Sequence, residues 1–198
     1  ASKLASATHE DLISIAPYMR ADDSSHTLAE PFTLKEDERL GFVFPVHGWR
    51  VPRLVREFIK QMKIQTEVPM TTTSTTQPAT SSTTQPAASS TTHPATRAKR
   101  PFVFCVCTAG DSIGLTIENL NDTIAQNPSL AAMGIQQVES SYSLIMPESY
   151  VGLPFMDVDT KEREICKKEE AAQELAVICE EVFNRKEGIS RLVKGPIP

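Results

Sequence analysis

The sequence predicts an α/β fold with a parallel sheet, because it contains two successive units of strand, loop and helix. In the first unit, the apolar run 40–46 leads into a short polar loop and a helix that begins near Pro52. In the second unit, the apolar run 102–107 leads into the loop 108–112 and a helical pattern that begins near Ile113. Continuous apolar runs are typical of strands that are buried on both faces of a sheet. Strands joined through a helix lie parallel, with a right-handed crossover.

Both predicted helices are amphipathic, which indicates that each packs on the sheet through one face. Their apolar residues recur at helical spacing: Val55, Phe58, Ile59 and Met62 in the first helix, and Ile117, Leu120 and Ile124 in the second. Pro52 suits a first helical turn, where no backbone hydrogen bond is lost. Asn127-Pro128 should break or kink the second helix. Gly134 then suits the position after a helix end.

The other elements are shorter or lie near the ends of the chain. Residues 1–8 should be the end of a helix, and Asp11–Ala16 predicts a short strand. A third strand is expected over 138–146. Asp159 or Thr160 could cap the last helix, which should end at Gly188. The residues expected on the inward face of this helix are Ile165, Ala172, Leu175, Cys179, Val182 and Phe183.

A tract of low complexity separates the two units. Residues 71–96 consist almost entirely of Thr, Ser, Pro, Gln and Ala, and Thr-Thr-Gln-Pro-Ala occurs twice. Such a composition cannot bury enough apolar area to offset the chain entropy, so the tract should be a disordered insertion. A mucin-like, glycosylated tract is the alternative, although nothing else in the sequence indicates secretion.

The composition excludes several classes of function. The chain has 198 residues and a formal net charge of −5, which gives no sign of a nucleic-acid-binding surface. No apolar run approaches the roughly 18 residues that a membrane span needs. The cysteines, Cys105, Cys107, Cys166 and Cys179, match no zinc or iron–sulfur spacing. We therefore expect a reduced, cytoplasmic protein in which Cys105 and Cys107 lie on the same side of one strand.

Three motifs resemble those of flavodoxin-like domains, and most closely the flavodoxin half of bacterial flavodoxin–ferredoxin fusion proteins. They are Gly41–Trp49 followed by Pro52, Val106–Gly114, and Met146–Tyr150. The resemblance covers nearly the whole chain outside residues 68–99. It implies a flavodoxin-like, three-layer α/β/α fold with strand order 2-1-3-4-5. It also implies an electron-transfer protein that binds FMN at the carboxyl ends of its strands, with the flavin carrying the chemistry.

Under this resemblance, two loops would hold the flavin ring. The residues of the first loop are Pro45, His47, Gly48 and Trp49, of which Trp49 can stack on the ring. The residues of the second loop are Thr108, Ala109, Gly110, Asp111 and Ser112, whose amides and hydroxyls suit polar ring atoms. Structural roles are the alternative. Trp49 could cover the sheet edge, Asp111 or Ser112 could cap the next helix, and His47 could be an exposed loop residue.

The chain departs from the resemblance in two ways. Flavodoxin-like domains begin with a strand and a Ser/Thr/Gly-rich loop that holds the FMN phosphate, whereas this sequence begins in the helix that would follow. The missing strand would be the central one, between 12–16 and 40–46. The ferredoxin half, with its Cys-x-x-Cys-x-x-Cys motifs, is also absent. We therefore expect a fragment or a gene that has lost function, with weak FMN binding or none, and with self-association through the gap as one way to cover it.

The resemblance also implies the organisation of the chain. Residues 1–67 and 100–188 would be the two parts of the flavodoxin-like domain, residues 68–99 the insertion, and residues 189–198 a tail or linker. A redox partner, such as a ferredoxin-type iron–sulfur domain, is expected.

Two other functions stay open. The domain could be a remnant or interaction module that binds no flavin. Gly110-Asp111-Ser112 also resembles the nucleophile block of Gly-Asp-Ser esterases, but every histidine of the chain precedes Ser112. No Gly-x-Ser-x-Gly elbow is present either, so an esterase is the least favoured reading.

Overall fold

The computed structural model describes residues 1–19, 28, 30–35, 37–66, 100–148 and 159–195. Its main sheet has four parallel strands in the order β2-β4-β5-β6. They are β2 (Arg39–Pro45), β4 (Phe102–Ala109), β5 (Ser140–Ile145) and β6 (Ser190–Arg191). The parallel pairing of β2 with β4 confirms the expected parallel strands, and β5 confirms the third predicted strand.

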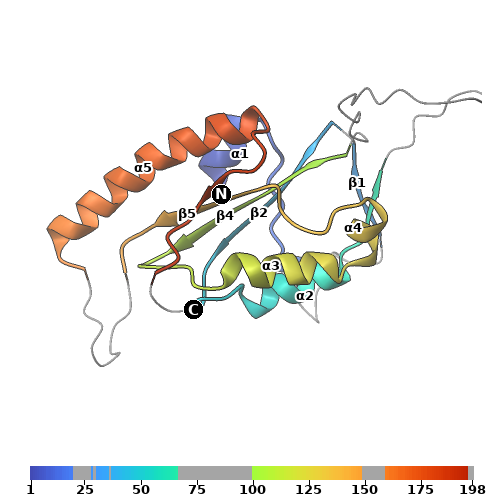
Figure 1. Cartoon of the computed structure of the whole chain (residues 1–198), viewed down its shortest axis with the longest axis horizontal. Coiled ribbons are helices and arrows are strands. Elements are labelled where there is room, and N and C mark those ends of the chain that lie inside the picture. Colours follow the sequence, from blue (N-terminus) through green and yellow to red (C-terminus); the bar gives the residue numbers. More distant parts are fainter. Residues whose placement is uncertain (20–27, 29, 36, 67–99, 149–158, 196–198) are drawn as a thin grey trace, which may run out of the picture.

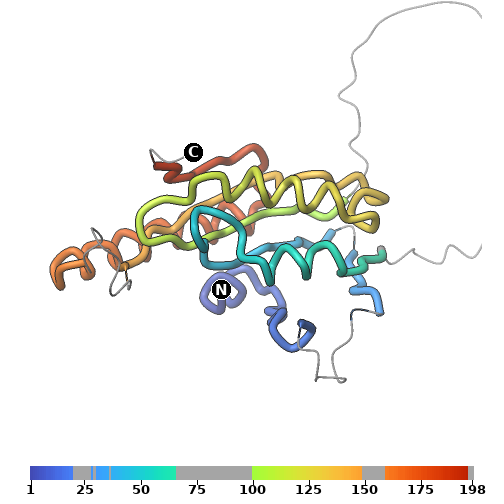
Figure 2. The backbone as a smooth tube through the Cα atoms, turned by 90° about the horizontal axis from the view of Figure 1, so that it is seen from below, coloured from blue at the N-terminus to red at the C-terminus, as the bar shows by residue number. Residues whose placement is uncertain are grey.

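Helices cover both faces of this sheet (Figures 1 and 2). On one face, α2 (Arg53–Gln61) packs beside α3 (Thr116–Ala125), which is followed by the short helix α4 (Pro128–Ala132). On the other face, α1 (Ser2–Thr8) packs beside α5 (Lys161–Phe183). A short 3₁₀ helix, η1 (Pro17–Met19), contacts α2. The structure therefore belongs to the α/β class.

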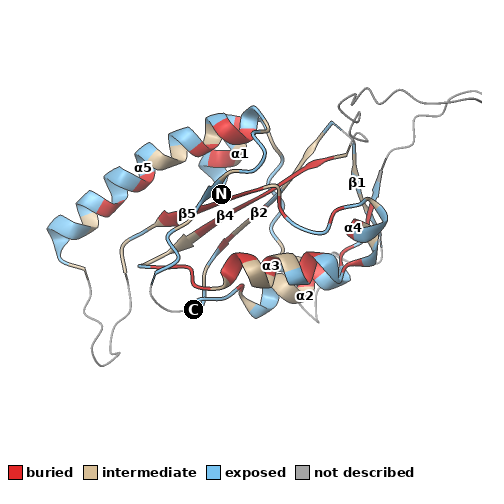
Figure 3. Cartoon of the chain, viewed as in Figure 1, coloured by how far each residue is buried: buried red, intermediate tan, exposed pale blue. Residues whose placement is uncertain are grey.

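Each face of the sheet has its own core, because successive strand residues point to opposite sides. β4 is buried along most of its length (Figure 3). In β4, Val103, Cys105 and Cys107 join the core under α2 and α3. Phe104 and Val106 join the core under α5. Cys105 and Cys107 thus lie on one side of one strand, as predicted, and all four cysteines are free thiols. Burial, followed by its neighbour Cys107, raises the pKa of the Cys105 thiol well above its ordinary value.

A second, two-stranded parallel sheet lies apart from the main one. It pairs β1 (Phe32–Leu34) with β3 (Ile64–Thr66). The predicted strand at Asp11–Ala16 is wrong, because no strand forms there and Leu12 and Ile13 are 56% and 52% exposed. A strand requires a neighbouring strand for its backbone amides and carbonyls, and the described residues offer this segment none.

The predicted break after α3 is confirmed. α3 ends at Ala125, and Asn127 begins α4 by accepting a 3.0 Å hydrogen bond from the Leu130 amide at Oδ1. The Asn127 Nδ2 group donates to the carbonyl oxygens of Ile59 and Met62, at 2.6 and 2.8 Å. This fully buried side chain therefore ties the end of α2 to the start of α4.

The last helix is placed correctly, but its predicted inward face is wrong in part. Thr160 caps α5 by accepting from the Arg163 amide, and Val182 is buried as expected. Ile165, Ala172 and Phe183 are exposed instead, and the helix ends at Phe183 rather than at Gly188. The buried residues of α5 are Lys167, Ala171, Ile178, Glu181 and Val182. Two of them are charged, which apolar periodicity does not anticipate.

Residues 71–96, the Thr/Ser/Pro-rich tract, lie outside the described residues. The chain leaves the described part after Thr66 and returns at Arg100, before β4 begins. Deleting residues 71–96 should change the free energy of unfolding by no more than about 1 kcal/mol, because closure entropy grows only logarithmically with loop length. Urea denaturation of both chains measures this. A loss of several kcal/mol, or resistance of the tract to protease in the native protein, would show that it packs.

The described residues meet the requirements of neither a membrane-spanning helix nor a metal site. Among them, no helix combines the length and the apolar character that crossing a bilayer requires. They contain no cluster of three or more His, Cys, Asp or Glu side chains arranged to hold a metal ion either.

Candidate functional site

The loop after β2 is a tight turn with unusual backbone geometry. His47 and Arg50 exchange backbone hydrogen bonds of 3.1 and 3.3 Å, which close the turn around Gly48 and Trp49. Both of these central residues have φ of 57°. Two consecutive positive φ angles are typical of a type I′ turn and suit glycine, but they are rare for a bulky residue such as tryptophan. Strain of this kind tends to occur at functional sites.

The loop after β4 lies beside this turn. Pro45 pairs with Thr108 in the strand register, and the Val46 amide donates a 2.7 Å hydrogen bond to the Thr108 carbonyl oxygen. The Met146 amide donates a bond of the same length to the Ala109 carbonyl oxygen from the end of β5. The two loops therefore lie side by side at the carboxyl edge of the sheet, as predicted.

Trp49 connects the two loops through Gly114. A Cβ atom on Gly114 would lie 2.6 Å from the Trp49 Cβ and 3.1 Å from its carbonyl oxygen, and Gly114 has φ of 52°. Only glycine fits there on both counts. Trp49 nevertheless keeps 38% of its surface exposed, so part of it is free to contact another molecule.

A buried lysine from α5 holds the loop after β4. Lys167 Nζ donates to the Gly110 carbonyl oxygen at 2.8 Å and to Asp159 Oδ2 at 2.6 Å. The hydrogen bond from Lys167, followed by one from the Glu148 amide, holds the pKa of Asp159 below its ordinary value. The Glu148 side chain also packs on Gly110, where a Cβ atom would lie 2.5 Å from Glu148 Cγ. Sequence reasoning missed Lys167, because only its buried position distinguishes it from the exposed lysines of the same helix.

Ser112 is buried, and its hydroxyl has no hydrogen-bond partner among the described residues. The expectation that Asp111 or Ser112 caps the next helix is wrong, because α3 begins at Thr116 and its capping position is Leu115. The end of the chain covers this loop instead. The amides of Ile113 and Gly114 donate to the carbonyl oxygens of Val193 and Lys194, at 3.0 and 3.2 Å. Gly195 packs directly on the Ser112 side chain, in a position where a Cβ atom would collide with it.

The two loops thus place a partly exposed aromatic ring beside the half-buried backbone of residues 108–110. Thr108, Ala109 and Gly110 are half-buried, while His47, Gly48 and Asp111 are exposed. The exposed part of the Trp49 ring suits stacking with a flat ligand. It does not assemble a nucleophile, since no histidine donates to or accepts from Ser112 among the described residues. His26 and His93 lie outside them.

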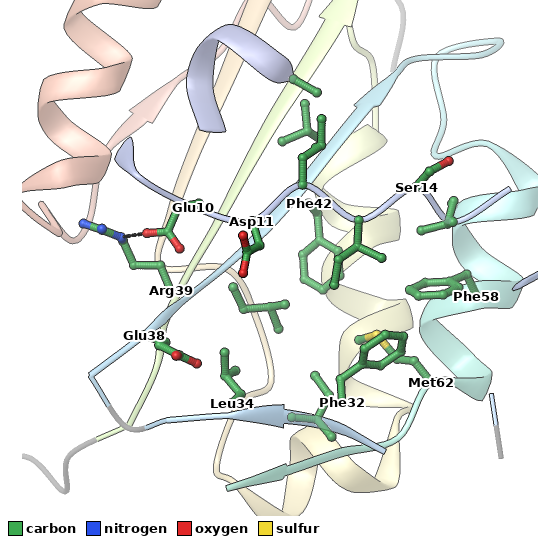
Figure 4. Close-up of a pocket in the computed structure, with 18 of the residues that line it drawn as sticks. Glu10, Asp11, Ser14, Phe32, Leu34, Glu38, Arg39, Phe42, Phe58 and Met62 are labelled. Carbon is green, nitrogen blue, oxygen red and sulfur yellow. Dashed lines mark hydrogen bonds and ion pairs between the residues drawn. The ribbon is translucent and has the colours of Figure 1, made fainter. Parts of the chain in front are cut away.

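A cavity lies elsewhere, along the side of β2 away from β4 (Figure 4). None of the described residues that line it belongs to the nine predicted site positions. It is bounded by residues 9–15, β1, residues 39–44 of β2 and α2.

Comparisons with protein family models, with curated protein sequences and with solved structures each returned no match.

Proposed function

We propose that this chain is an FMN-binding electron-transfer domain of the flavodoxin-like type, in which the two loops at the carboxyl edge of the sheet hold the flavin ring. The observation that carries the proposal is the contact of Trp49 with Gly114, which follows the loop Thr108–Ser112 and precedes α3. In an open parallel sheet, ligands bind at this edge.

The residues present fit the ring of a flavin. The exposed part of Trp49 offers a flat surface for stacking. Lys167 fixes the loop after β4 by donating a hydrogen bond to the Gly110 carbonyl oxygen. The flavin, when bound, supplies the electron transfer, and the protein side chains bind and orient it.

The phosphate of FMN finds no equivalent cradle among the described residues of either loop. Under the proposal, a Ser/Thr/Gly-rich loop joined ahead of Ala1 would supply that cradle. Residues 1–198 alone should therefore bind riboflavin and FMN with similar affinity, micromolar or weaker. Quenching of flavin fluorescence by the protein tests this. Tight, nanomolar binding of FMN, or no saturable binding of either flavin up to about 1 mM, would contradict the proposal.

Replacing Trp49 by alanine should weaken the binding of riboflavin and FMN by about 1–2 kcal/mol each, because the ring loses its stacking partner. The change corresponds to a roughly 5- to 30-fold rise in Kd, measured by flavin fluorescence. Leu54→Ala is a matched control, since Leu54 is another exposed apolar residue, on α2. Equal binding by the Trp49→Ala protein and the control would show that Trp49 only covers the sheet edge.

The second candidate is a domain of the same class that binds another protein and no flavin. The cavity beside β2 favours it, because this cavity borders a strand edge and lies away from the flavin loops. Colour separates the two candidates in a chain that carries the phosphate loop: an FMN protein purifies yellow, and an interaction module purifies colourless.

A further inference from the structure

The segment that follows β6 crosses the end of the second loop and passes beside the residues that precede α3 (Figure 1). We call this segment, residues 192–195, the strap. The amides of Ile113 and Gly114 donate to the carbonyl oxygens of Val193 and Lys194, at 3.0 and 3.2 Å. The strap therefore occupies two main-chain donors that lie directly after the loop Thr108–Ser112.

The other contacts of the strap with described residues are weak or exposed. The Val193 amide donates a 2.8 Å hydrogen bond to Ser143 Oγ, and Leu192 packs against the core under α2 and α3. Lys194 Nζ donates to Glu118 Oε1 at 2.6 Å, but these two side chains are 58% and 44% exposed. Ion pairs with such exposure add little stability. Segments held in this way open more readily than the protein as a whole.

The strap also covers Ser112. Gly195 lies against the Ser112 side chain, so that a Cβ atom on Gly195 would lie 2.4 Å from Ser112 Cβ and 2.6 Å from Oγ. All nine predicted site positions are described, and Ser112 alone among them is buried. A ligand in the second loop therefore meets the strap before it can reach Ser112 or the amides of residues 113 and 114.

We propose that the strap is a releasable cover, which competes with the flavin ring for the end of the second loop. This inference rests on the proposed function, in which that loop holds the ring. In the closed state, the strap carbonyl oxygens occupy the two amides and Gly195 blocks Ser112. In the open state, the hydroxyl and both amides can bond to the polar edge of the ring. A ligand that binds the open state alone gains affinity by the factor by which the open fraction rises.

Gly195→Ala should open the strap in the whole chain. The added methyl group would collide with Ser112, and Gly195 has φ of 71°, which alanine rarely adopts. Gly188→Ala is the matched control. Gly188 has φ of 74°, but nothing beyond its neighbours in the chain lies within 4 Å of an added Cβ. Ser112→Gly removes the atoms that the methyl group would meet, so Gly195→Ala should have a smaller effect in that background.

Hydrogen exchange of the Ile113 and Gly114 amides, followed by NMR, measures how often the strap is open. Both amides should exchange at least about tenfold faster in Gly195→Ala than in the parent protein, because the strap accepts their hydrogen bonds. In Gly188→Ala, both rates should stay within about twofold of the parent values. The thermal midpoint of each variant establishes that it is folded.

A second variant releases the strap without a collision. Lys194→Ala removes the ion pair with Glu118 and should raise both exchange rates by about two- to threefold at low salt. Lys168→Ala is its matched control, because it removes a similarly exposed ion pair with Glu164 on α5, away from the strap. This control should leave both rates unchanged.

Riboflavin shows whether the strap excludes the ring, because it carries the ring without the phosphate. Its affinity, measured by fluorescence quenching, should rise in Gly195→Ala by the same factor as the exchange rates, as long as the closed state stays dominant. Gly188→Ala should bind riboflavin like the parent protein. If the strap instead braces the loop, its release should weaken binding.

Two results would overturn the strap proposal and leave the flavin proposal intact, since riboflavin would still bind. The first is exchange of both amides at the same rate in the parent protein and in folded Gly195→Ala. The second is faster exchange in Gly195→Ala with unchanged or weaker binding of riboflavin. The absence of saturable riboflavin binding to the parent protein and to every variant would contradict the flavin proposal. The strap proposal would then fall with it, because the strap would have no ligand to exclude.

Discussion

The affinity for FMN should rise by about three to six orders of magnitude when a strand and a Ser/Thr/Gly-rich loop are joined ahead of Ala1. Ala1 lines the groove beside β2 and leads directly into α1, so an added strand can enter there. The loop would supply backbone amides and hydroxyls to the FMN phosphate, each worth roughly 1.5–3 kcal/mol. Three such bonds amount to about 4–9 kcal/mol. Titration of flavin fluorescence measures the change.

Riboflavin is the matched ligand control, because it carries the same ring without the phosphate. Its affinity should change far less than that of FMN in the extended chain. An extension in which alanine replaces each Ser and Thr of the loop is the matched protein control, and it should lose part of the gain. Equal affinities for riboflavin and FMN in the extended chain would refute the proposed division of the site into a ring half and a phosphate half.

Replacing Asn127 by alanine should lower the free energy of unfolding by about 3–5 kcal/mol. The side chain is fully buried and makes three hydrogen bonds, with the backbone of Ile59, Met62 and Leu130. Its loss leaves two carbonyl oxygens and one amide unpaired, each costing roughly 1–3 kcal/mol when buried, and it also removes a helix cap. Urea denaturation at pH 7 gives the value directly.

Two further substitutions sharpen this result. Gln126→Ala, at the exposed neighbouring residue, should stay within about 0.5 kcal/mol of the parent protein. Asn127→Asp keeps the acceptor for the Leu130 amide but places a carboxylate against two carbonyl oxygens. Its folded-state pKa should be raised, so its stability should be highest below about pH 4 and should fall as the pH rises. A loss below about 1 kcal/mol for Asn127→Ala would mean that water or a backbone shift replaces the three bonds.

The sequence alone determined the α/β class and the position of the loops. The run 102–107 is continuously apolar, as a strand covered on both faces must be, and it forms the centre of β4. Asn127-Pro128 ended α3, because the residue before a proline avoids helical geometry. The turn His47–Arg50 and the loop Thr108–Ser112 lie together for a topological reason: parallel strands carry their carboxyl ends to one edge.

Only the tertiary structure decided which residues of α5 face inward. Lys167 and Glu181 are buried with partners that lie outside α5. Lys167 pairs with Asp159 and donates to the Gly110 carbonyl oxygen, and Glu181 pairs with Arg191, at 2.9 and 3.1 Å. The hydrogen bond from Arg191 holds the pKa of Glu181 below its ordinary value. Apolar periodicity cannot reveal a buried charge, since burial of a charge depends on a partner that local sequence does not contain.

The same dependence on distant partners explains the other differences. Residues 11–16 have the composition of a strand, but a strand forms only where another edge completes its backbone hydrogen bonds. Serine is a residue type that often caps helices, but residues 193–195 pack on the loop that contains Ser112. α3 begins four residues after it, at Thr116. Trp49 adopts a positive φ because the bonds between His47 and Arg50 close the turn around it. Local sequence sets what each segment can form, and the contacts made after folding select among those forms, because each backbone polar group and each charge must find a partner.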